Sequence, residues 1–175
     1  MRYEDVVRTI SISYALLLGL TVTATAIGQE SKKTAVLNSF TGHFVLVGAT
    51  GDLRFDPHST TQPTLEVDTK SGGFEVQRTA RRGQEHMILP LDGTVVQYST
   101  MTGHSAQAKV TLSGKRLEIT KDIQPSGRFD LPTHSVERWN LSRDGKVLKI
   151  CGHSDSGIRA VTQFRISGCQ IYERK

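Results

Sequence analysis

Beyond residue 41, much of the chain consists of short segments in which apolar and polar residues alternate. In the segment 64–69 (Thr-Leu-Glu-Val-Asp-Thr), Leu65 and Val67 fall on one face and the polar residues on the other. The segment 105–112 alternates in the same way, with Ala, Val and Leu at every second position. A period of two is typical of a β-strand with one buried face.

Turn-forming glycines punctuate these segments, and most of the gaps between them are 10 to 13 residues: Gly72, Gly83, Gly93, Gly103, Gly114, Gly127, Gly145, Gly157 and Gly168. Such spacing indicates an all-β sandwich or barrel. The pattern predicts strands over 42–48, 64–69, 85–90, 94–98, 105–112, 133–142, 146–154 and 161–173, with further strands around 74–76 and 117–119. We expect an antiparallel up-and-down meander of about 8–10 strands, closed into a barrel that hides its edges. No amphipathic helix is expected after residue 28.

The first 28 residues resemble a signal peptide. Arg2 and Arg8 lie before an apolar run that extends to Ile27. Ala24-Thr25-Ala26 fits the small-x-small cleavage pattern. We expect export to the periplasm or the medium, with a mature chain that begins at Ile27 or Gln29. The alternative is an uncleaved membrane anchor, since residues 10–27 are just long enough to span a bilayer.

Removal of residues 1–28 leaves 147 residues, enough for one domain with its own core. We expect a polar lead-in over 29–40 and a single barrel domain over 41–175. After cleavage, no stable membrane span is predicted.

The net charge of +5 is modest, and its one dense patch is Arg78, Arg81 and Arg82 beside Gly83. We expect these arginines at a solvated hairpin tip, with an anion or membrane contact as the alternative. Aromatic residues are few and are not interleaved with basic ones, so no nucleic-acid partner is predicted.

Motifs of catalysis and metal binding are not found in the sequence. The histidines show neither HxH nor HExxH spacing, and no serine lies in a Gly-x-Ser-x-Gly elbow. Asp92-Gly93 and Asp144-Gly145 are interpreted as hairpin turns because neither lies in the dense acidic loop that calcium needs. We therefore predict no metal, no cofactor and no enzymatic activity.

Two segments resemble a known family. Residues 137–148 (Glu-Arg-Trp-Asn-Leu-Ser-Arg-Asp-Gly-Lys-Val-Leu) resemble a "W-x-L-S-x-D-G-K-x-L" signature, and Tyr172-Glu173-Arg174 resembles the "Y-E-R" ending that accompanies it. Together they are similar to lipocalin-like, calycin-type β-barrel proteins of bacterial envelopes, over residues 85–175. Lipocalins open with Gly-x-Trp, where this chain has Gly42-His43-Phe44. The resemblance implies a barrel with an interior cavity.

Three functional hypotheses follow. The favoured one is an exported binding module that holds a small apolar or amphipathic molecule, with Phe44, Tyr98, Trp139 and Phe164 as candidate ligand-binding residues. The alternative is a structural or protein-interaction domain of the cell envelope with a filled barrel. An enzyme is the least favoured. Trp139 itself has two interpretations, a core residue or the lining of an internal pocket.

The two cysteines, Cys151 and Cys169, are predicted to form a disulfide, as is usual for an isolated pair in an exported chain. Two registers compete for the last hairpin. A tight turn near residue 156 would set Cys151 opposite residue 160 or 161. A wider loop centred on Ala160 would balance the two strands and set Cys151 directly opposite Cys169. We favour the wider loop, with the bridge on the outer surface.

Overall fold

Ten antiparallel strands form the barrel in the computed structural model, which describes residues 34–70, 73–127, 131–157 and 164–175. The strands are β1 (Gly42–Gly51), β2 (Thr64–Lys70), β3 (Gly73–Ala80), β4 (Gly83–Pro90), β5 (Val96–Ser99), β6 (Ser105–Ser113), β7 (Arg116–Ile123), β8 (Thr133–Leu141), β9 (Val147–Ser156) and β10 (Phe164–Arg174). The predicted all-β meander is confirmed. The predicted segment 1–28 lies outside the described residues.

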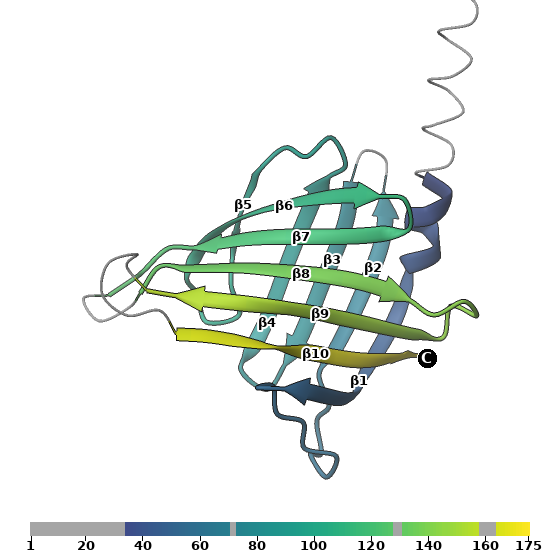
Figure 1. Ribbon diagram of the computed structural model, residues 1–175, viewed down its shortest axis with the longest axis horizontal. Coiled ribbons are helices and arrows are strands. Elements are labelled where there is room, and N and C mark those ends of the chain that lie inside the picture. The colour runs from purple at the N-terminus through teal and green to yellow at the C-terminus, as the bar shows by residue number, and fades with distance from the viewer. Residues whose placement is uncertain (1–33, 71–72, 128–130, 158–163) are drawn as a thin grey trace, which may run out of the picture. The chain divides into compact units, whose positions relative to one another are not determined.

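The sheet follows the order β4-β3-β2-β1-β10-β9-β8-β7-β6-β5. Each hydrogen-bonded pair of strands is consecutive in the chain, apart from β1 and β10, which join the two ends of the domain. In Figure 1, β6 to β10 cross in front of β2 to β4, so the sheet curls back over itself. β4 and β5 are in contact at the seam, but no ladder joins them among the described residues. The barrel is therefore nearly closed.

Part of the barrel interior is a packed core. Trp139 has no exposed surface, which confirms that this residue is buried. Its ring packs edge-on against Phe74, with 5.8 Å between centroids, and Phe74 packs in the same way against Phe40, at 6.4 Å. Phe44 is also fully buried. Aromatic pairs in this arrangement stabilise a core beyond their area burial.

A short helix over residues 34–40 replaces the end of the expected polar lead-in. Leu37 and Phe40 are each only 1% exposed. Arg174, at the end of β10, donates a hydrogen bond from Nη2 to the carbonyl of Ser39 (2.6 Å), and its guanidinium lies 4.9 Å from the centre of the Phe44 ring. The expectation of no helix is therefore wrong. The sequence pattern does not reveal this helix, because about two turns carry too few apolar positions to show a period of 3.6.

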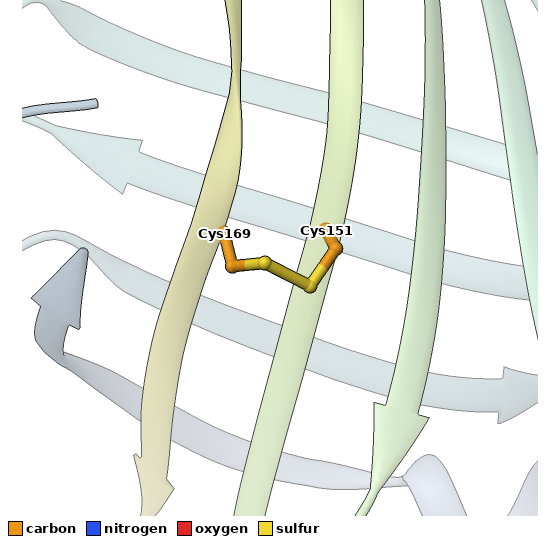
Figure 2. The surroundings of a disulfide bond; sticks show 2 residues. All are labelled: Cys151 and Cys169. Carbon is orange, nitrogen blue, oxygen red and sulfur yellow. A yellow bond between two sulfur atoms is a disulfide. The ribbon is translucent and has the colours of Figure 1, made fainter. Parts of the chain in front are cut away.

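The register of the last hairpin is the wider of the two alternatives. Tyr172 pairs with Leu148, and Cys169 pairs with Cys151. The two cysteines form a disulfide between neighbouring strands, as Figure 2 shows. Ile150, next to Cys151, is buried in the interior, so alternation along β9 turns Cys151 to the outer face.

The disulfide should stabilise the barrel chiefly by restricting the unfolded chain. We expect the double variant Cys151→Ser/Cys169→Ser to lose about 3 kcal/mol of unfolding free energy, the value for a loop of this length. Urea unfolding measures this loss, and reduction of the wild type should reproduce it. Two reactive thiols in denatured, unreduced protein from an oxidising compartment would contradict the bridge.

Candidate functional site

A cavity of about 400 Å³ occupies the barrel interior. Its walls come from seven strands and two connections: Leu53, Arg78, Glu85, Tyr98, Thr100, Met101, Thr102, Lys121, Ile123, Ser135, Val136, Glu137, Ile150, Gly152, His153, Ser154, Ile166, Gly168 and Gln170. β10 contributes its first half to this lining, whereas the helix over 34–40 contacts the other end of β10 through Arg174. The cavity and residues 37–40 therefore lie toward opposite ends of the barrel.

Two glycines help to leave this space open. Gly152 and Gly168 pair across β9 and β10, and both line the cavity. A Cβ atom on Gly152 would collide with the Val136 carbonyl of β8, and one on Gly168 would collide with the Thr50 carbonyl of β1. Larger residues are therefore excluded where these strands approach each other, and the inward positions stay without side chains.

Four charged side chains form a buried network on the cavity wall. Arg78 makes two hydrogen bonds to the Glu137 carboxylate, one of 2.8 Å from Nη1 to Oε1 and one from Nη2 to Oε2. Lys121 Nζ lies 2.7 Å from Glu85 Oε1 and 3.1 Å from Glu137 Oε1. The indole Nε1 of Trp139 donates to Glu137 Oε2 at 3.1 Å. These four charged side chains are between 5% and 16% exposed, so the charges are nearly out of water.

The network holds Glu137 and Arg78 in the charged state. Burial opposes ionisation of Glu137, but the charges of Arg78 and Lys121, with the hydrogen bonds from Arg78 and Trp139, bring the pKa of Glu137 well below its usual range. Burial likewise opposes the charge on Arg78, and the attraction of Glu137 outweighs it and raises the pKa of Arg78. Burial, followed by the negative charges of Glu85 and Glu137, raises the pKa of the Tyr98 hydroxyl.

Two polar atoms on the wall lack a hydrogen-bond partner among the described residues. They are Nε of Arg78 and the hydroxyl oxygen of Tyr98, and both are buried. The Tyr98 ring also lies 5.9 Å from Lys121 Nζ, within range of a cation–π interaction. Buried polar atoms without partners are rare in folded proteins, so each marks a position where a bound molecule could supply the missing bond.

The predicted ligand-binding residues occupy different places. Tyr98 lines the cavity. Phe44 and Trp139 are fully buried in the core, where Trp139 supports the wall through Glu137. The backbone of Phe164, the first residue of β10, pairs with Ser156 of β9. The side chain of Phe164 lies outside the described part of the chain.

The placement of Arg78 corrects the prediction of a solvated arginine patch. Arg81 and Arg82 are exposed at the turn between β3 and β4, but Arg78 points into the barrel. The reason is strand alternation, since Arg78 continues the inward face of Phe74 and Val76.

The same alternation contains the signal for the rest of the network. Lys121 lies two positions after Ile119, and Glu85 lies two positions before Met87. Glu137 likewise lies two positions before Trp139. Each of these charged residues therefore lies on the inward face of its strand, next to a buried apolar residue on the same face.

His, Cys, Asp and Glu side chains do not gather in threes at any possible metal site within the described ranges. The charged groups on the cavity wall are instead paired with one another.

Across the described residues, no helix is both long enough and apolar enough to cross a membrane.

Comparison with solved structures identifies the fold. The barrel resembles the REP1-NXSQ fatty acid transporter, with a TM-score of 0.54 and 10% identity over 79% of this chain and 97% of that one. It also resembles fatty-acid-binding protein 1 of Echinococcus granulosus, with a TM-score of 0.55 and 12% identity over 78% and 98%. A fatty-acid-binding protein from Drosophila melanogaster brain gives 0.50 and 17% over 77% and 98%.

No protein-family model matches the sequence, and no curated protein matches it either. At these identities the likeness shows the fold alone, which is an antiparallel β-barrel, as the sequence resemblance implied.

Proposed function

We propose that the protein is a binding module that holds a small apolar or amphipathic molecule inside its barrel. The observation that carries this proposal is the cavity of about 400 Å³, which falls in the range of roughly 300–1,000 Å³ for small-molecule sites. Leu53, Met101, Ile123, Ile150 and Ile166 give it an apolar wall. Apolar atoms supply most of the surface that lines the cavity, and polar groups converge on it, as is typical of such sites.

The names of the similar structures support the same interpretation, because those proteins are described as binding or transporting fatty acids. The cavity also favours ligand binding over the alternative of a structural domain with a filled barrel. We propose binding without catalysis, since the ionised groups of the wall are neutralised by one another.

Native mass spectrometry of protein purified from its own host tests the proposal. We expect a co-purifying small molecule with the wild type, and loss of that molecule in Ser135→Phe, which would fill the cavity from β8. Asn140→Phe is the matched control, because Asn140 lies on the same strand and is exposed. A clean ligand-free mass for the wild type would favour the structural or interaction role.

We also propose that the barrel is exported to an oxidising compartment, periplasmic or outside the cell. The signal-like segment 1–28 and the disulfide of Cys151 and Cys169 support this location. N-terminal sequencing of the exported form should begin at Ile27 or Gln29. A chain that still starts at Met1 in the membrane fraction would contradict cleavage.

A further inference from the structure

The charges on the cavity wall cancel within the wall. Arg78 and Lys121 supply two positive charges, and Glu85 and Glu137 supply two negative ones, all within the distances of direct ion pairs. His153 also borders the cavity, and its Nε2 lies 3.6 Å from a carboxylate oxygen of Asp155, so a proton on this ring would be offset in the same way. A bound molecule therefore meets no uncompensated charge.

This balance works against a ligand with a charged head group. A carboxylate in the cavity would be repelled by Glu85 and Glu137. It could gain an ion pair only by taking Arg78 or Lys121 from the network, which would leave the two buried carboxylates with one cation between them. Such a step is costly, because a buried charge that loses its ion-pair partner is strongly destabilising. An ammonium head group would be repelled by the two cations and could gain an ion pair only by taking Glu85 or Glu137 from the network. Both signs of charge are disfavoured.

The wall nevertheless offers unused hydrogen bonds. Arg78 Nε is a donor without a partner, and the Tyr98 hydroxyl, which can donate or accept, has none either. Both residues line the same cavity. A neutral oxygen could accept from these groups without disturbing the ion pairs.

We propose that the ligand is an amphipathic molecule with an apolar chain and an uncharged oxygen head group, such as an alcohol, ester or ketone, and that fatty-acid anions are discriminated against. This inference rests on the binding function proposed above. The head group would lie against Tyr98 and Arg78, and the chain would lie along the apolar residues.

A matched series of ligands tests the proposal on the wild-type protein. Decanol, methyl decanoate, sodium decanoate and decane are titrated at neutral pH, with the fluorescence of Trp139 as the signal, since this single tryptophan is bonded to the cavity residue Glu137. We expect decanol and methyl decanoate to bind at least about tenfold more tightly than decanoate. Equal or tighter binding of decanoate would overturn the inference and leave the binding function intact. Binding of none of the four, by fluorescence and by calorimetry, would overturn both.

A charge variant distinguishes the effect of the wall charge on ligand affinity from the effect of the greater hydrophobicity of neutral ligands. Glu85→Gln leaves one uncompensated positive charge, while Lys121 keeps its contact with Glu137. We expect the affinity ratio of decanoate to decanol to rise about tenfold or more. The matched control is Glu118→Gln, because Glu118 pairs with Arg138 on the outer face of the barrel and should leave the ratio unchanged. A ratio unchanged in Glu85→Gln would contradict control by the wall charge.

A second variant tests the head-group contact. Tyr98→Phe removes the hydroxyl that has no partner in the structure, so folding should be little affected. We expect decanol to bind about 2- to 10-fold more weakly, the value of one hydrogen bond, and decane to bind as before. Equal weakening of both ligands would show a change in cavity shape and would contradict the contact.

Discussion

Replacement of Glu137 by glutamine is expected to lower the free energy of unfolding by about 3–5 kcal/mol at neutral pH. The carboxylate of Glu137 accepts from both terminal nitrogens of Arg78 and contacts Lys121 at 3.1 Å. The variant leaves Arg78 buried and charged without its direct ion-pair partner. A loss of this size is a large share of the stability of an ordinary domain, which is about 5–15 kcal/mol. Urea unfolding at constant pH measures it.

The loss should depend on pH in a defined direction. The pKa of Glu137 is lowered in the folded state, so its stabilisation is complete above the unfolded-state value near 4.5 and is lost as the pH falls toward the lower folded value. The difference between wild type and Glu137→Gln should therefore be constant from about pH 6 to 8 and shrink below about pH 4.5.

Glu118→Gln is the matched control for this experiment as well. Its half-exposed ion pair with Arg138 should contribute less than about 1 kcal/mol. A loss in Glu137→Gln no larger than in this control would show that the buried network contributes little to stability.

The second large effect is expected for Trp139→Ala, which should lose about 3–5 kcal/mol of unfolding free energy. The indole is fully buried, packs against Phe74, lies 5.5 Å from the guanidinium carbon of Arg78 and donates to Glu137. Its removal opens a void in the core and also releases the carboxylate that holds the wall together. Thermal unfolding and urea unfolding measure the change.

Two further variants provide a comparison for the stability loss of Trp139→Ala. Trp139→Phe keeps most of the packing and should lose less than Trp139→Ala. Ile88→Ala should stay within about 0.5 kcal/mol of the wild type, because Ile88 is 52% exposed. A melting temperature of Trp139→Ala equal to that of the wild type would mean that the packing around the indole adds nothing to stability.

Much of the barrel can be predicted from the sequence, because a period of two is a local signal. Strand alternation predicts the inward face of β6 and the burial of Trp139. Equal lengths for the two strands of the last hairpin predict the pairing of Cys151 with Cys169. Backbone geometry alone fixes these relations.

The cavity and its charges are harder to predict. They depend on where along each strand the inward-facing side chains fill the barrel and where they leave space. Arg78 obeys the same alternation as Phe74, but its residue type and its neighbours Arg81 and Arg82 suggest solvent. Only the assembled barrel shows that Glu137 arrives from another strand to compensate the charge of Arg78, and that Lys121 arrives from a third strand to pair with the same carboxylate. The space left by Gly152 and Gly168 likewise depends on how closely neighbouring strands approach, which the sequence does not encode locally.

The pairing of β1 with β10 brings the two ends of the barrel domain together, so the strands could be connected in a different order along the chain. Lys175 donates its amide to the carbonyl of His43 at 3.0 Å, so the two ends of the barrel domain are neighbours. A circular permutant that joins Lys175 to Thr41 through a short linker and opens the chain between β4 and β5 would place all ten strands in the same order in the sequence and in the sheet. The distant pairing of β1 with β10 would become a hairpin. Such a chain would need no encounter between remote segments to complete its ladder, so it should fold faster than the natural order.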